Sequence, residues 1–324
     1  MAKYCRLGCL LCLALGAAPL SLGAEIPSPL DRFSQWTYVN GEATHYYDTL
    51  ASGTPQFTLL LVHGWLGSGY NFRFLIELFP PSVRVIAPDL PGFGLSERAE
   101  GPYTMESLVA FLDGFTDALG LTRFVIAGSS MGGNITVEFI AAHPEKIDRV
   151  ILIAADGLRG EEGPRLFWAR LGPLVDLGAT LETKNTIKRF LRKNVFYDEQ
   201  KIPEELVDSI ARSILTRQGR RLSAEVTKHL LGRNPVDEIL PLLQQPTLLI
   251  WGANDPLLKP VWAERYLELL PHAALRRIDG CGHMPAVEAP EQTKDLILEF
   301  LDYRLPVSLR PVGEGYGLSQ AARC

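Results

Sequence analysis

The stretch VIAGSSMGGNIT, residues 125–136, decides the fold prediction because it holds two adjacent serines between glycines. The pattern Gly-x-Ser-x-Gly places Ser130 at the centre of GSSMG. Residues 123–127 predict a short buried strand, and residues 134–142 are apolar at the spacing of a helix. A sharp turn from strand to helix holds the central serine in a strained conformation, with its hydroxyl exposed above the sheet. Ser130 is therefore the predicted nucleophile, and an ordinary capping serine in a glycine-rich turn is the alternative.

Length and composition limit the class of protein. The chain has 324 residues, of which 47% are hydrophobic, so it is long enough for one large core with an insertion or a small second domain. Its net charge is −5, and it has no tract rich in lysine and arginine of the kind that binds nucleic acid. We therefore expect no nucleic-acid partner.

The N-terminus has the pattern of an export signal. Lys3 and Arg6 precede an uncharged run, residues 7–22, which ends in small residues before Ala24. Residues 1–24 therefore predict a cleaved signal peptide, with an uncleaved membrane anchor as the alternative. In both cases the protein is exported, to the periplasm or medium or onto a membrane. Of the five cysteines, Cys281 and Cys324 lie beyond this segment, either as free thiols or as one bridge.

Strand patterns alternate with helix patterns along most of the chain, which predicts a mostly parallel eight-stranded sheet with helices on both faces. The expected strands are residues 36–39, 43–47, 57–62, 83–87, 123–127, 149–154, 247–251 and 275–278. The expected helices are residues 72–78, 105–119, 134–142, 261–270 and 291–301.

The alternation stops between the sixth and seventh expected strands. Residues 157–245 are amphipathic and helical, which indicates an inserted cap over the sheet. The core is then formed by residues 25–156 and 246–303. The tail, residues 304–324, gives no fold signal.

A serine nucleophile needs a base and an acid that orients the base. His283 follows the last expected strand in a glycine-flanked loop, at the sheet edge where Ser130 emerges. Asp255 follows the strand at 247–251 and is the preferred acid. Asp156, just after the preceding strand, is the rival, and Asp89 is expected to fasten the tight loop in which it lies.

The oxyanion of a tetrahedral intermediate needs two backbone N–H donors. We expect one from Met131, the residue after the nucleophile, and one from Trp65, in the loop after the strand at 57–62. No metal-binding or nucleotide-binding motif is found, and this chemistry requires neither a metal nor a cofactor.

Five motifs carry a resemblance to a known superfamily: HGWLGSG, PDLPGFG, GSSMGG, WGANDPLL and GCGHMPAVEAP. In this order and spacing the chain resembles an α/β-hydrolase with a helical cap, over residues 57–301. Within that superfamily it is most similar to the monoacylglycerol-lipase-like branch, which includes exported bacterial esterases, lipases and phospholipases. The resemblance implies a triad of Ser130, Asp255 and His283. The long tail and the divergent cap depart from the family pattern.

The predicted function is therefore hydrolysis of carboxylic esters, with a small acyl ester or a lipid as substrate. Hydrolysis of a carbon–carbon bond in a ring-cleavage product is the first alternative, and export counts against it because such substrates are made inside the cell. A ligand-binding protein on a hydrolase scaffold is the second, although such proteins often lack a triad member.

A basic stretch in the cap suggests where lipid could bind. Five basic side chains crowd about three helical turns, namely Lys184, Lys188, Arg189, Arg192 and Lys193. They indicate either a solvated helix face or a surface that meets anionic phospholipid. Membrane contact through this stretch and the N-terminal segment is therefore a hypothesis.

Overall fold

A computed structural model of the chain describes residues 29–49, 54–97, 103–160, 184–215, 217–230 and 234–301. The predicted signal segment, the early part of the cap and the C-terminal tail, with Cys324, lie outside the described residues. Within the described part, no helix combines the length and apolar character that crossing a membrane requires.

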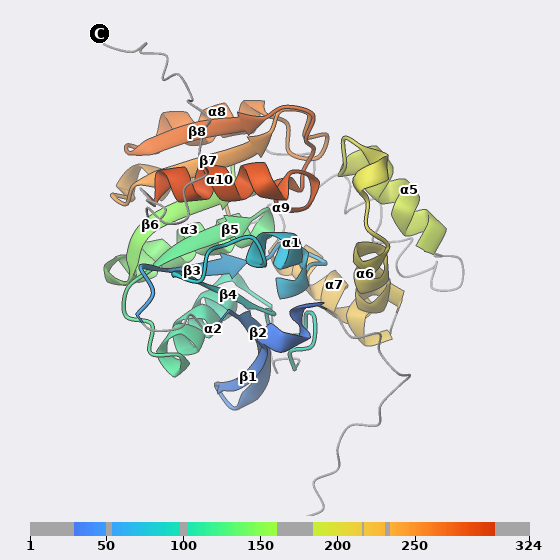
Figure 1. Cartoon of the computed structure of the whole chain (residues 1–324), viewed down its shortest axis with the longest axis horizontal. Helices are drawn as coiled ribbons and strands as arrows, with labels where there is room; N and C mark the ends of the chain where they lie inside the picture. Colours follow the sequence, from blue (N-terminus) through green and yellow to red (C-terminus); the bar gives the residue numbers. More distant parts are fainter. Residues whose placement is uncertain are drawn as a thin grey trace, which may run out of the picture.

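The centre of the molecule is an eight-stranded sheet in the order β1-β2-β4-β3-β5-β6-β7-β8 (Figure 1). Its β1–β2 and β2–β4 pairs are antiparallel, and the remaining pairs are parallel. All eight expected strands are present, so the predicted sheet is confirmed. The strands are β1 (Ser34–Val39), β2 (Glu42–Asp48), β3 (Phe57–Val62), β4 (Val83–Pro88), β5 (Phe124–Ser129), β6 (Ile147–Ile153), β7 (Thr247–Gly252) and β8 (Ala273–Ile278).

The helices of the sheet layers lie close to the expected positions, except for α9, which the sequence did not predict. They are α1 (Arg73–Ile76), α2 (Met105–Ala118), α3 (Met131–Ala142), α8 (Val261–Leu269), α9 (Pro285–Glu288) and α10 (Pro290–Phe300). The helix expected at 72–78 is shorter than predicted: Phe72 belongs to a preceding 3-10 turn, Gly69–Phe72, and the helix ends at Ile76 with Glu77 as its C-cap.

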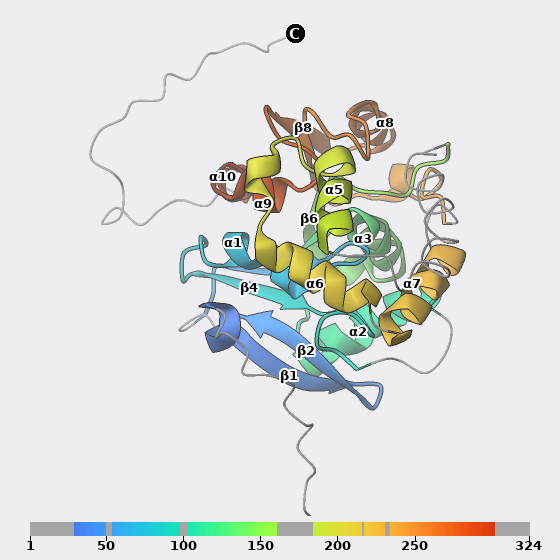
Figure 2. The same cartoon turned by 90° about the vertical axis from the view of Figure 1, so that its right-hand side faces the viewer.

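Two hydrophobic layers sandwich the sheet, because successive side chains of a strand point to opposite faces. On β3, Leu60 and Val62 pack with α2, α3 and α8, whereas Leu59 and Leu61 pack with α1 and α10. Figure 2 shows these two groups of helices on opposite sides of the sheet. The central strands are buried on both faces, which explains their continuous apolar sequences.

The segment between β6 and β7 contains α5 (Lys184–Asn194), α6 (Glu204–Leu215) and α7 (Arg217–His229). Figure 1 places α5 and α6 to one side of the sheet, and Figure 2, in which that side faces the viewer, draws them in front of the strands. They therefore lie outside the two helix layers. Their apolar faces form a third hydrophobic cluster, while Leu222 and Val226 of α7 join the main core. We refer to α5, α6, α7 and the turns between them as the cap.

Candidate active site

Ser130 lies at the carboxyl end of β5, where the chain turns directly into α3. Its backbone has φ 54° and ψ −123°, a conformation that residues other than glycine rarely adopt. The turn is held by three main-chain hydrogen bonds: Ser130 N–H donates to Ile153 O at 3.1 Å, and Ser130 O accepts from Gly133 N at 2.8 Å and from Asp156 N at 3.1 Å. Ser130 is therefore rigidly held in a strained bend.

Glycines allow the chain to pass close to this bend. A Cβ atom on Gly128 would lie 2.3 Å from Gly132 O, and a Cβ atom on Gly132 would lie 2.3 Å from Val62 O. A Cβ atom on Gly64 would lie 3.0 Å from both Ser129 O and the Cβ of Ser130. The loop after β3 thus runs directly against the serine, as an oxyanion loop must.

The two predicted oxyanion donors flank this contact. Met131 is the first residue of α3, where N–H groups have no partner within the helix. Trp65 directly follows Gly64 in the loop that touches Ser130. Met131 thus follows Ser130, Trp65 follows the glycine that touches it, and both remain the predicted oxyanion donors.

His63 holds the same loop in place, a structural role that the sequence did not predict. Its Nδ1 donates to Gly64 O at 2.7 Å, and its Nε2 accepts from Leu90 N at 3.0 Å, which assigns a neutral ring with its proton on Nδ1. Burial lowers the pKa of His63, which keeps it neutral. His63 therefore joins the loop after β3 to the loop after β4.

His283 and Asp255 form a buried pair. Asp255 Oδ2 accepts from His283 Nδ1 at 2.8 Å, and the carboxylate's other oxygen accepts from Leu257 N and Leu258 N, both at 2.8 Å. The two side chains are 0% and 7% exposed, in the order Asp255 and His283. The structure thus provides a histidine whose tautomer is set by a carboxylate, which leaves Nε2 as the basic nitrogen.

Burial alone would lower the pKa of His283. The charge and the hydrogen bond of Asp255 nevertheless raise this pKa above the ordinary 6.5, and Asp156 and Glu288 make smaller contributions in the same direction. Asp156 is thus near enough to act on the ring electrostatically. It is Asp255, however, that hydrogen-bonds to His283, so the preferred acid rather than its rival is paired with the base.

Ser130 and His283 lie on loops at the same edge of the sheet, since parallel strands end on the same side. Among the hydrogen bonds of the described residues, none joins Ser130 Oγ to His283. Catalytic hydrogen bonds are often long without substrate and shorten in the complex, so their absence does not rule out a candidate base.

A second Ser–His–Asp chain lies on the antiparallel side of the sheet. Ser34 Oγ is 2.8 Å from His45 Nε2, and His45 Nδ1 is 2.9 Å from Asp89 Oδ2. Asp89 also accepts from Gly69 N at 2.7 Å and Leu95 N at 2.8 Å, so it fastens its loop as expected. The sequence did not reveal the Ser34–His45 contact, because it depends on the pairing of β1 with β2.

Ser34 differs from Ser130 in its backbone. It is a regular residue of the edge strand β1, whereas Ser130 occupies a strained bend at a helix N-terminus. Side-chain hydrogen bonds alone therefore do not identify the nucleophile, and backbone position separates the two serines.

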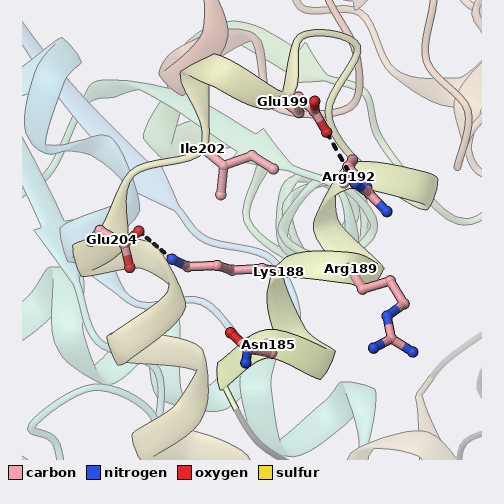
Figure 3. Close-up of a pocket in the computed structure, with 7 residues that line it drawn as sticks. All are labelled: Asn185, Lys188, Arg189, Arg192, Glu199, Ile202 and Glu204. Atoms are coloured by element: carbon pink, nitrogen blue, oxygen red, sulfur yellow. Dashed lines mark hydrogen bonds and ion pairs between the residues drawn. The ribbon is translucent and has the colours of Figure 1, made fainter.

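Three of the five basic side chains of this stretch, Lys188, Arg189 and Arg192, line a pocket of about 350 Å³ between α5 and α6 (Figure 3). Lys188 forms an ion pair with Glu204, and Arg192 lies 3.4 Å from Glu199 (Figure 3). Lys184 likewise pairs with Asp208. Within the described residues, Arg189 and Lys193 have no ion-pair partner, so the positive charge available for a lipid surface is smaller than the sequence suggested.

In the described ranges, no group of three His, Cys, Asp or Glu side chains is arranged to hold a metal ion. Cys281 is a buried free thiol, and burial raises its pKa to about 12.

Comparison with known proteins gives a family match and similar proteins with different activities. A family model described as the alpha/beta hydrolase fold matches residues 58–290. The uncharacterized hydrolase YugF of Bacillus subtilis is 30% identical over 280 residues, which cover 86% of this chain and 99% of that protein.

A 2-hydroxy-6-oxononadienedioate/2-hydroxy-6-oxononatrienedioate hydrolase of Burkholderia vietnamiensis is 31% identical over 79% of this chain and 90% of the relative. Among solved structures, a bacterial membrane phospholipase A superposes with a TM-score of 0.71 at 29% identity, over 83% of this chain and 85% of that one. These two similarities are of about equal strength and name different reactions.

Proposed function

Since the chain belongs to the α/β-hydrolase fold family, we propose that this hydrolase cleaves carboxylic esters with Ser130 as its nucleophile. The observation that carries the proposal is the strained bend of Ser130, with φ 54°, pressed against Gly64 at the edge where the His283–Asp255 pair lies. A nucleophile, a base with its orienting acid, and backbone donors are the groups that acyl transfer needs.

In the proposed mechanism, His283 Nε2 removes the hydroxyl proton of Ser130 as Oγ attacks the ester carbonyl carbon. The N–H groups of Trp65 and Met131 stabilise the oxyanion that forms. The intermediate collapses to an acyl-serine, and the leaving alcohol takes its proton from His283. His283 then removes a proton from water as the water attacks the acyl-serine, and it returns that proton to Ser130 Oγ as the acyl–oxygen bond breaks and the carboxylic acid leaves.

Lipid esters are the proposed substrate class. The similarity to a membrane phospholipase A supports this choice, as does the N-terminal pattern of an export signal or anchor. We further propose that the protein acts outside the cytoplasm, at or near a membrane.

Cleavage of a carbon–carbon bond is the second candidate, favoured by the similarity to the Burkholderia vietnamiensis hydrolase. The two candidates share the nucleophile and base and differ in the bond that is broken.

Hydrolysis of p-nitrophenyl esters from acetate to palmitate by the full-length chain tests the proposal, with 2-hydroxy-6-oxononadienedioate as the competing substrate. We expect turnover of the esters, with an optimum chain length that reports the size of the acyl pocket. Turnover of the dienedioate alone would instead assign the carbon–carbon reaction.

A further inference from the structure

The loop that carries His283 is bonded to the cap through one buried carboxylate. Glu288, the last residue of α9, is 3% exposed. Both of its oxygens lie 3.0 Å from Gly282 N, and Oε1 also accepts from Met284 N at 3.3 Å. The residues on either side of His283 therefore donate to the same carboxylate.

The same carboxylate also binds the turn that follows α5. Glu288 Oε2 accepts from Tyr197 N at 2.9 Å, and the carbonyl of Glu288 accepts from Lys201 Nζ at 2.8 Å. The carboxylate of Glu288 thus bridges two segments that are more than eighty residues apart in the sequence.

The main chains of the cap turn and the histidine loop also touch directly. His283 N–H donates to Val195 O at 2.7 Å. A Cβ atom on Gly282 would lie 2.4 Å from Val195 O and 2.7 Å from Tyr197 N, so a side chain here would push the two segments apart. Among the described residues, His283 is therefore hydrogen-bonded to Asp255 of the core and to Val195 of the cap.

Apolar contacts reinforce this link. Val287 of α9 is buried in the third hydrophobic cluster, together with Ile187 and Leu191 of α5. Met284 packs against the same cluster, as does Leu66 from the loop after β3. The loops that carry the proposed base and an oxyanion donor each place a side chain in the cap.

From these contacts we propose that Glu288 is a positioning residue, which aligns His283 for proton transfer by fixing its loop to residues 195–197 of the cap. The inference rests on the proposed function, in which His283 is the base. It assigns the cap a part in catalysis besides covering the site, because the base keeps its alignment only while this turn is docked.

Two kinds of variant separate positioning from simple packing. Glu288→Gln removes the charge and cannot accept hydrogen bonds with both terminal atoms. Tyr197→Pro leaves Glu288 intact and deletes the cap N–H, whereas Tyr197→Ala retains that N–H and serves as the matched comparison. Glu291→Gln, on an exposed carboxylate three residues further along the chain, is the control for loss of one negative charge.

We expect Glu288→Gln and Tyr197→Pro to lower kcat by about 10- to 100-fold with little change in KM, as for other residues that orient a reacting group. Since the charge of Glu288 helps to raise the pKa of His283, Glu288→Gln should also lower the acid midpoint of kcat/KM. Tyr197→Pro should reduce kcat without that shift, because the charge remains.

A spectroscopic readout makes the test independent of substrate. The imidazole of His283 is titrated by NMR in full-length wild type and variants, with thermal unfolding recorded to confirm folding. A lowered pKa in Glu288→Gln and a changed ring environment in Tyr197→Pro would support the proposal.

Wild-type kcat and an unchanged His283 signal in folded Glu288→Gln and Tyr197→Pro would overturn it. If the wild type hydrolyses no ester while the His283 signals still shift, the ester assignment fails and the positioning role stands. If Glu288→Gln does not fold, Tyr197→Pro and its alanine partner decide the matter.

Discussion

Ser34 is hydrogen-bonded to the His45–Asp89 pair, whereas Ser130 lies at the sheet edge that carries the His283–Asp255 pair. The backbone conformations of these two serines predict opposite behaviour. Ser130→Ala should lower kcat/KM for a p-nitrophenyl ester by about 10⁴-fold or more, because it removes the proposed nucleophile. Ser34→Ala should leave kcat/KM unchanged and lower the free energy of unfolding by about 1 kcal/mol, the usual cost of losing one hydrogen bond. Steady-state kinetics and urea unfolding check both. A large loss of activity in Ser34→Ala would reassign the nucleophile.

The raised pKa of His283 predicts the pH dependence of the activity. His283 acts as a base only when neutral, so kcat/KM should fall as the pH drops through a midpoint above 6.5, the ordinary value for histidine. Asp255→Asn should move this midpoint down and reduce kcat. A pH–rate profile for each protein gives both midpoints, and a wild-type midpoint below 6.5 would contradict the assignment.

The same ring affects stability with the opposite sign. Because its pKa is raised on folding, the charged His283–Asp255 pair contributes fully to stability below pH 6.5, and this contribution is lost as the pH rises through the folded-state pKa. His63 behaves differently: its pKa is lowered by burial, so acid below about pH 6.5 protonates the unfolded chain first and destabilises the fold. Activity is therefore expected to rise over a range in which the contribution of His283 to stability falls.

At the scale of elements, the loop after β3 must stay in contact with the bend at Ser130. A methyl group on Gly64 would lie 3.0 Å from Ser129 O and from the Cβ of Ser130. Gly64→Ala should therefore displace the oxyanion loop and lower kcat by about 10²- to 10³-fold, the usual cost of one oxyanion donor. Gly120→Ala is the comparison, because no atom lies within 4 Å of a Cβ placed there, although its positive φ strains the backbone. Comparable kcat in the two variants would argue against the role of this loop.

The basic face of α5 carries the prediction about lipid. Lys188 and Arg192 are engaged with Glu204 and Glu199 (Figure 3), and Lys184 is engaged with Asp208. The basic side chains of α5 that can meet an anionic surface are therefore Arg189 and Lys193. Arg189→Glu combined with Lys193→Glu should weaken binding to vesicles that contain phosphatidylglycerol, while hydrolysis of a short soluble ester stays intact. Vesicle co-sedimentation measures the first and spectrophotometry the second. Equal binding by the double variant would leave α5 as a solvated face.

Across the whole molecule, the order of strands and helices was predictable because apolar residues recur at one spacing in strands and at another in helices. The buried strand Phe57–Val62 and the helix Met105–Ala118 could be placed from apolar spacing alone. Strand ends then located the site, since Ser130, Asp255 and His283 each follow a parallel strand. The triad order fits both Asp156 and Asp255; Asp255 was preferred because it lies on the loop after the strand at 247–251, whereas Asp156 also fits as a hinge or N-cap residue of the cap.

Other contacts were not predictable, because they join segments that are distant in the chain. Glu288 binds Tyr197, and Ser34 binds His45, only once the cap has docked and the edge strands have paired. The ion pairs of Lys188 and Arg192 likewise need α6 beside α5. Periodicity describes one element at a time, so the link between cap and base required the fold.

In the proposed reaction, Ser130 is the residue that takes the acyl group. The most direct test is to label the full-length protein with a fluorophosphonate and to map the labelled peptide by mass spectrometry. A fluorophosphonate forms a bond to an activated serine and releases fluoride. We expect one adduct on Ser130 that is absent in Ser130→Ala and slow to form in Asp255→Asn. An adduct on Ser34, or none on a folded protein, would contradict it.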